Sequence, residues 1–286
     1  MALKRIQEYL STGDGTAGTL LIPKLIMEPM IEEVDKTLLP RELAAMVFGP
    51  SQIKGASFNV NLENPNTMDV REVAEGAEIP LDLQDYTNVE FTPTKFGVAI
   101  RITREMMEDS QFELFQRNIR IAGKRIAEKE NELIIDALVA GAGATTTGGA
   151  AITIANITES MQDLEDSDYT GTDFIIGNEV LNDLRNIDTF VEANKVGNTE
   201  MLQRGFLGTI YGLSVVRFST NAVSDATYRR RGFVIDRTQA YGLAIWRDIT
   251  VENFDLPTFD MQGAVVTWRF DVQILRANAI SMITTE

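Results

Sequence analysis

Three glycines near the start of the chain have the spacing of a dinucleotide-binding loop. Gly13, Gly15 and Gly18 match the pattern G-x-G-x-x-G, in which the glycines let the backbone approach a pyrophosphate. A loop of this kind follows a strand and opens a helix, whereas this one follows a short amphipathic stretch and leads to Pro23. The sequence therefore argues against a nucleotide site and predicts no bound cofactor.

A second candidate is a loop of oxygen-bearing side chains between a predicted helix and a predicted strand. Asp166, Asp168 and Gly171 match the start of a calcium-binding loop. The twelfth position, where such a loop needs a bidentate glutamate, is Gly177, and Glu179 comes two residues late. We therefore predict a solvated turn and no dedicated metal site, with a weak adventitious cation site left open.

Carboxylates gather in the segment 64–88. A pair of them could act as general acid and base, but only in a partly dry pocket that separates their pKa values, and the spacing predicts no such pocket. Solvated charge, or salt bridges to another chain, is the favoured interpretation, since runs of charge are usually solvated. One arginine against six carboxylates gives the segment a net charge of −5; these residues are Arg71, Asp69, Glu72, Glu75, Glu78, Asp82 and Asp85.

The one basic run is Arg229, Arg230 and Arg231. Guanidinium groups bind carboxylates and phosphates in the same forked geometry. In a chain with an acidic excess, pairing with acidic residues of this or a neighbouring chain is favoured over recognition of nucleic acid.

The composition of the whole chain narrows the chemistry further. The 286 residues include no histidine and no cysteine, and 26 basic against 42 acidic residues give a formal charge of −16. Nucleophiles activated by histidine, thiolate or imidazole metal sites and disulfides are thereby excluded, and no catalytic residue is predicted. The acidity argues against wrapping nucleic acid, which needs cations at the phosphates. No segment resembles a signal peptide or a membrane span, so we expect a soluble intracellular protein.

The elements that position these residues follow from the apolar spacing. The chain should open with an arm and one amphipathic helix that ends before Pro40. Strands over 57–63 and 89–102 should flank the acidic segment as a long loop, and loops of this length usually carry function. Apolar steps of three and four residues predict a helix over 111–140, with a cap at Asp109–Ser110 and with Lys124 and Glu128 paired on its outer face.

The second half predicts alternating strands and helices, followed by an antiparallel sheet. Trp246 and Trp268 should belong to the core of that sheet. The expected elements are a short strand at Ile152–Ile154, a helix over 157–164 capped by Thr158, a strand over 174–176, a helix over 179–186, strands over 213–216 and 233–235, and C-terminal strands over 243–251, 264–270 and 272–283.

Four segments, in their order along the chain, resemble a known family. Residues 13–23 resemble a glycine-rich N-arm, residues 73–80 (VAEGAEIP) an extended loop, residues 91–110 the strand that returns from that loop and enters a spine helix, and residues 205–216 (GFLGTIYGLSVV) an element of an axial domain. Together they resemble the major capsid proteins of tailed phages and related archaeal viruses, whose Hong Kong 97-like fold is shared by encapsulin shells. The resemblance extends over nearly the whole chain.

The resemblance implies an α+β, Hong Kong 97-like capsid fold in five regions. These are an N-terminal arm and first helix (1–50), an extended β-hairpin loop or E-loop (51–103), a peripheral domain with the spine helix (104–150), an axial domain (151–245) and C-terminal strands that return to the peripheral domain (246–286). It also implies subunit contacts through Arg71, Glu72, Glu75, Gly76, Glu78, Asp82 and Asp85 of the loop and through Gly13, Gly15, Gly18 and Pro23 of the arm, with Arg229, Arg230 and Arg231 as a basic partner patch.

The implied function is structural rather than enzymatic. A major capsid protein assembles as pentamers and hexamers into the icosahedral shell of a virion, in the host cytoplasm, around double-stranded DNA that it does not bind specifically, and without a membrane. A separate scaffolding protein is expected because the chain begins almost at the arm, and a portal and a decoration protein are further implied partners. The extended loop has no lysine, so the autocatalytic crosslink of some family members is not expected. An encapsulin shell around a cargo enzyme stays open as the alternative, and a Mg²⁺-dependent carboxylate hydrolase as the third.

Overall fold

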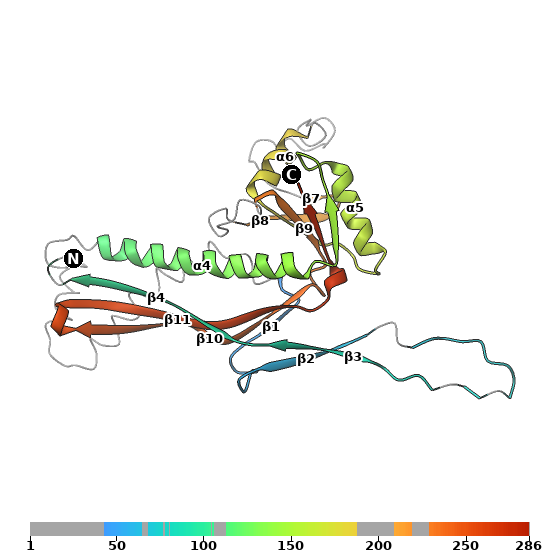
Figure 1. Ribbon diagram of the computed structural model, residues 1–286, viewed down its shortest axis with the longest axis horizontal. Coiled ribbons are helices and arrows are strands. Elements are labelled where there is room, and N and C mark those ends of the chain that lie inside the picture. Colours follow the sequence, from blue (N-terminus) through green and yellow to red (C-terminus); the bar gives the residue numbers. More distant parts are fainter. Residues whose placement is uncertain are drawn as a thin grey trace.

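The computed structural model describes residues 43–64, 68–76, 78–79, 81–103, 105, 113–187, 209–218 and 229–285. In this part of the chain a long helix lies along one sheet, a second sheet with two helices stands at one end of that helix, and a hairpin points away from the body (Figure 1). The predicted arm, with Gly13, Gly15, Gly18 and Pro23, and the predicted cap at 109–110 lie outside the described residues.

Helix α4, Glu113–Gly141, is the long helix that the apolar spacing predicts. Its 29 residues span about 44 Å at about 1.5 Å per residue. Ile126, Ile134 and Leu138 are buried along its length. The predicted end at Gly141 is confirmed, and a Cβ at this position would lie only 2.3 Å from Cγ1 of Ile274.

The pair of Lys124 and Glu128 forms as predicted, but its predicted place on the outer face of the helix is wrong for Glu128. This side chain is buried, with 5% exposed. Its carboxylate accepts a hydrogen bond from Nη1 of Arg125 at 2.8 Å, and Nζ of Lys124 lies 3.9 Å away. The reason is that α4 is covered from two sides, since residues of both large sheets share one core cluster with it.

The helix packs on a four-stranded sheet with the order β1-β10-β11-β4. All neighbours in it are antiparallel except β1 and β10, which run parallel. Side chains alternate between the two faces of a strand, so Val266, Trp268 and Phe270 enter the core under α4 while their neighbours in sequence face away. The strands are β1 (Met46–Phe48), β4 (Thr94–Thr103), β10 (Tyr241–Leu256) and β11 (Met261–Ile274), and the turn Pro257–Phe259 joins the last two.

A six-stranded sheet with the order β5-β12-β9-β6-β8-β7 forms the second part of the body. Its central strand β6 is buried at all four residues, as expected for a short apolar strand with neighbours on both sides. Helices α5 (Ile154–Glu165) and α6 (Asn178–Asn186) pack on it. The strands are β5 (Ala144–Thr147), β6 (Asp173–Ile176), β7 (Thr209–Ile210), β8 (Leu213–Arg217), β9 (Arg231–Ile235) and β12 (Ile280–Thr284).

The predicted strand over 89–102 is two strands that belong to different sheets. Strand β3 (Tyr86–Phe91) pairs with β2 (Phe58–Glu63) to form the hairpin, whereas β4 pairs with β11. Pro93 lies between them, and its missing N–H cannot take part in a strand ladder. The chain therefore changes partners at this proline.

The predicted strand at Ile152–Ile154 is wrong, because α5 begins there. Thr153 rather than Thr158 is the cap, and its Oγ1 accepts a hydrogen bond from the backbone N of Asn156 at 3.4 Å. Thr158 lies inside the first turns, where its hydroxyl donates to the carbonyl of Ala155 at 2.9 Å.

The C-terminal strands do not all return to one sheet. The predicted strand over 272–283 is interrupted by the turn Ala277–Ala279, after which β12 pairs with β5 and β9 of the six-stranded sheet. Strand β12 thus belongs to the six-stranded sheet rather than to the four-stranded one, and the five regions with their boundaries stay predictions.

Candidate functional site

The hairpin β2–β3 is fixed to the body at its base by packed aromatic rings. The ring centroid of Phe48 lies 4.8 Å from that of Phe58 and 6.1 Å from that of Phe91. Phe91 is fully buried. Trp246, predicted as core, is half-buried in this cluster, and its indole N–H donates to the carbonyl of Gly55 at 3.1 Å. Packing at the base therefore sets the direction in which the hairpin leaves the body.

Beyond the two strands, the legs of the hairpin are joined by polar contacts. The backbone N of Asn64 donates to the carbonyl of Asp85 at 3.0 Å, and the backbone N of Asp69 donates to Oδ2 of Asp82 at 3.2 Å. Nε of Arg71 donates to Oδ2 of Asp69 at 3.0 Å, and its Nη2 lies 3.5 Å from Oδ1 of Asp82. Two of the predicted subunit contacts, Arg71 and Asp82, thus meet each other within this chain.

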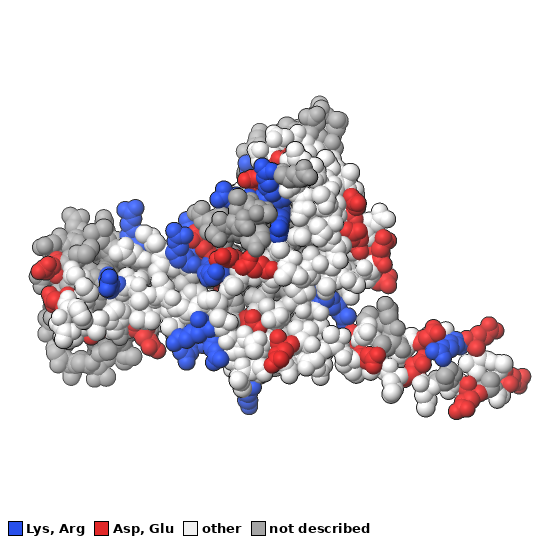
Figure 2. Space-filling view, viewed as in Figure 1, with Lys and Arg blue, Asp and Glu red and all other residues white. Residues whose placement is uncertain are grey.

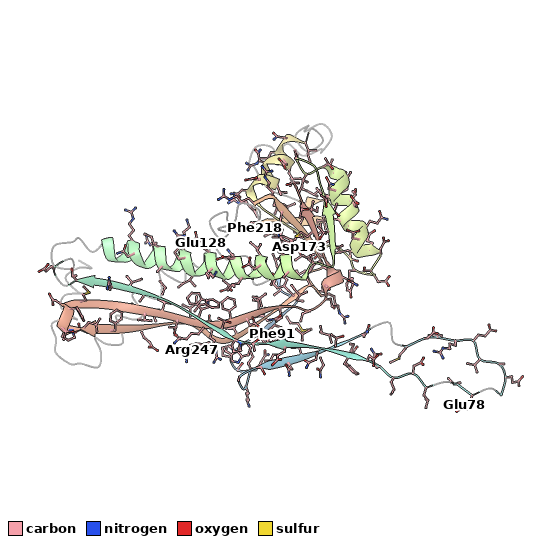
Figure 3. All side chains as sticks on the ribbon, in the orientation of Figure 1. Glu78, Phe91, Glu128, Asp173, Phe218 and Arg247 are labelled. Atoms are coloured by element: carbon pink, nitrogen blue, oxygen red, sulfur yellow. The ribbon has the colours of Figure 1, made fainter. Side chains whose placement is uncertain are left out.

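The three glutamates among the predicted contacts of the hairpin point into solvent. Glu72, Glu75 and Glu78 are exposed, and no ion pair joins them to any residue in the described ranges. Gly76 has a φ of 80°, which favours glycine, and it turns the chain near the far end, where Figure 3 labels Glu78. Figure 2 shows the hairpin as a string of acidic side chains around a single basic one.

The hairpin also exposes large apolar side chains that we did not identify from the sequence. Val70 and Leu81 are each 98% exposed, and Leu83 is 86% exposed. Exposed apolar groups gathered in one segment mark an interaction surface. The sequence feature that could have identified them is the recurrence of aliphatic residues through an acidic segment. We call these residues the apolar hairpin set: Met68, Val70, Val73, Ile79, Leu81, Leu83 and Tyr86.

The basic run lies at the start of strand β9. Nε of Arg230 donates to Oε2 of Glu179 at 2.7 Å, so this arginine pairs with an acidic residue of its own chain. Arg229 and Arg231 are half-buried beside it. A contact of this run with a neighbouring chain stays a prediction.

The calcium-like segment forms the predicted turn. Asp166 caps the end of α5, where its backbone N donates to the carbonyl of Gln162 at 2.8 Å. Asp168 adopts a φ of 64° in the turn that follows. In the ranges that the structure describes, no three acidic, histidine or cysteine side chains gather as a metal site would require. Within the same ranges, none of the helices combines the length and hydropathy of a membrane-spanning segment.

One known protein family matches the chain over most of its length. Residues 18–285 match the model of the Phage capsid family. No curated protein sequence matches the chain.

Solved structures share its architecture. One from Mycobacterium phage Che8 has a TM-score of 0.66 at 16% identity, covering 80% of this chain and 85% of that one. The capsid structure of the cyanophage P-SCSP1u has a TM-score of 0.66 at 12% identity, covering 85% and 86%. A virus-like particle from Pyrococcus furiosus has a TM-score of 0.59 at 13% identity, covering 91% and 98%. The predicted α+β, Hong Kong 97-like fold is therefore confirmed.

Proposed function

Because the chain belongs to the phage capsid family, it is a major capsid protein whose copies form an icosahedral shell, and we propose that the extended hairpin supplies the main contact between neighbouring copies. The observation that carries this proposal is the apolar hairpin set. Its members stand on a projection that its own chain leaves uncovered in the described ranges, with Val70 and Leu81 at 98% exposure.

The free energy of burial favours a second copy of the chain as the partner that buries these side chains. Burying a single Val or Leu side chain stabilises by about 1.5–3 kcal/mol. Each hairpin carries several such residues. In a closed ring of subunits every copy both gives and receives a hairpin, so this free energy of burial is gained at every contact. A projection with fixed direction loses little conformational freedom on binding, and the aromatic base of the hairpin provides that rigidity.

The finer features of the shell are part of the proposal, and membership of the phage capsid family supports them. We infer assembly as pentamers and hexamers in the host cytoplasm, around double-stranded DNA held without specific binding. A separate scaffolding protein, a portal and a decoration protein are the further partners. The protein has no enzymatic role in this proposal, and the net charge of −16 would keep packaged DNA from adhering to the wall.

The encapsulin alternative is not favoured, because the matching family is that of phage capsids. The likeness to the Pyrococcus furiosus particle is one of fold, at 13% identity. The carboxylate hydrolase has no support from the hairpin, because its glutamates point into solvent rather than into a partly dry pocket.

The experiment that tests the hairpin contact changes one exposed side chain. The purified chain, with and without scaffolding protein, is assembled and followed by light scattering and electron microscopy. Leu81→Asp should abolish shells while the monomer keeps its circular dichroism spectrum and melting temperature. Leu81→Met, the matched control, should assemble like the parent chain. Shells from Leu81→Asp at parental yield would contradict the proposal.

A further inference from the structure

Three cations lie directly opposite one another on adjacent strands of the four-stranded sheet. Arg247 of β10 is in register with Arg269 of β11, and Arg269 is in register with Lys95 of β4. Neighbouring strands lie about 4.8 Å apart, so the three side chains form a row about 10 Å long. We call it the basic row.

The basic row faces away from helix α4. Phe96 and Trp268, the neighbours in sequence of Lys95 and Arg269, pack with the core under the helix, and their ring centroids lie 5.7 Å apart. Since side chains alternate along a strand, Lys95 and Arg269 stand on the opposite face, and Arg247 shares that face because it is in register with Arg269. Figure 3 labels Arg247 on that side, where Figure 2 shows a basic cluster below the body.

This arrangement is unfavourable in an isolated subunit. Like charges directly opposite on neighbouring strands destabilise a sheet. No carboxylate in the described ranges forms an ion pair with any of the three cations. A ligand with several negative charges would remove this repulsion.

The row also borders a hollow that could receive such a ligand. The cavity has a volume of about 240 Å³ and is lined by the three cations with Pro93, Thr267 and Trp268. Arg247 and Lys95 are exposed and Arg269 is half-buried, so their charged groups stay accessible.

We propose that the basic row receives the glutamates of the hairpin of a second copy of this chain. Glu72, Glu75 and Glu78 supply three exposed carboxylates without an ion pair in the described ranges, and the row supplies three cations without one. The hairpin of the same chain cannot serve, because Glu78 lies at its far end and Arg247 under the body (Figure 3). This inference rests on the proposed function, which needs a receiving surface for each hairpin.

A carboxylate ligand fits better than nucleic acid. Nucleic-acid surfaces combine many cations along one face, whereas this row is three residues long on a chain of charge −16. Guanidinium groups bind carboxylates in bidentate pairs, and two of the three cations are arginines. Binding of DNA at the row is therefore the competing outcome of the test.

The test is a charge swap across the contact. Arg247→Glu with Arg269→Glu should raise the protein concentration needed for shell assembly about tenfold, because several exposed ion pairs become repulsive. Adding Glu72→Arg, Glu75→Arg and Glu78→Arg to the same chain should restore assembly. The control is Lys54→Glu with Arg101→Glu, which changes the charge equally at exposed positions away from the row and should assemble like the parent chain.

The outcomes separate the two proposals. If the control is impaired as much as the row variant, or if the swap does not restore assembly, the basic row is not the receptor. If the row variant assembles normally but retains less DNA, the ligand is nucleic acid and the inference is overturned. If parental shells form and Leu81→Asp blocks them while the row variant has no effect, the hairpin contact stands and only this receptor is wrong. A parent chain that stays monomeric with scaffolding protein contradicts both.

Discussion

Nη2 of Arg71 lies 3.5 Å from Oδ1 of Asp82, on the opposite leg of the hairpin. The same guanidinium donates from Nε to Asp69 on its own leg, at 3.0 Å. The lone arginine of the hairpin therefore holds its two legs together, and it leaves the outward glutamates for other partners. The pair therefore bears on the proposed contact between copies through the geometry of the hairpin rather than through charge.

We predict that Arg71→Gln changes hairpin order much more than stability. The Arg71 and Asp69 side chains are 48% and 71% exposed, and exposed ion pairs contribute about 0–1 kcal/mol. The free energy of unfolding, measured in urea, should thus fall by less than about 1 kcal/mol. Hydrogen exchange of residues 68–85 should become faster. Unchanged exchange there would show that the pair does not hold the legs.

Phe91 should be a main determinant of stability at the base of the hairpin. Its ring is fully buried between Phe48 and Phe58, and Phe→Ala changes in such cores cost about 3–5 kcal/mol. Denaturation of Phe91→Ala should show a loss of this size. Tyr86→Ala, on the same strand but 61% exposed, is the control and should stay within about 0.5 kcal/mol of the parent. Equal losses for both would mean that the base is not a separate core.

Much of the fold could be predicted because its elements have a strong local pattern. The spine helix and strand β2 follow from apolar steps over their own residues, and the end of α4 follows from Gly141. The sequence also contains Pro93, but no local feature of the sequence indicates that the chain moves from one sheet to another there. The hydrophobic pattern continues on both sides of the proline, and only the pairing partners differ.

The candidate site could be predicted only in part. The acidic hairpin is continuous in sequence, so its charge was apparent. The basic row joins Lys95, Arg247 and Arg269, which come together only through the register of three strands. The bulge between Ile245 and Arg247 shifts that register by one residue, so alternation alone could not place Arg247 in the row.

A close approach of two strands should make Gly263 intolerant of any side chain. A Cβ at this position would lie 2.2 Å from the carbonyl oxygen of Ile100 and 2.5 Å from Cζ of Phe254. Backbone atoms of a paired strand cannot move aside cheaply, so Gly263→Ala should lower the free energy of unfolding by about 1–3 kcal/mol. At Gly49 a Cβ would meet nothing within 4 Å, and Gly49→Ala should be nearly neutral. A neutral Gly263→Ala in the same denaturation series would contradict this pairing of β4 and β11.

Tyr241 should make the fold sensitive to alkali. Burial raises the pKa of its hydroxyl above the ordinary value of 10.0, the charge of Asp173 raises it further, and Arg237 acts in the opposite direction. The folded chain therefore keeps this proton at pH values where the unfolded chain loses it. Because the unfolded state then binds fewer protons, the free energy of unfolding should fall above about pH 10, by at most about 1.4 kcal/mol per pH unit from this group.

Tyr241→Phe isolates that contribution from the other groups that titrate in alkali. The hydroxyl is buried, and no residue in the described ranges accepts or donates a hydrogen bond to it, so its removal should leave stability near pH 8 equal or slightly higher. Urea denaturation of both chains between pH 8 and pH 11 should show a steeper loss for the parent than for Tyr241→Phe. Parallel curves would mean that Tyr241 ionises equally in the folded and unfolded chains. The absorbance of tyrosinate reports how many tyrosine hydroxyls have lost a proton. In alkali, unfolding should ionise one more tyrosine in the parent chain than in Tyr241→Phe.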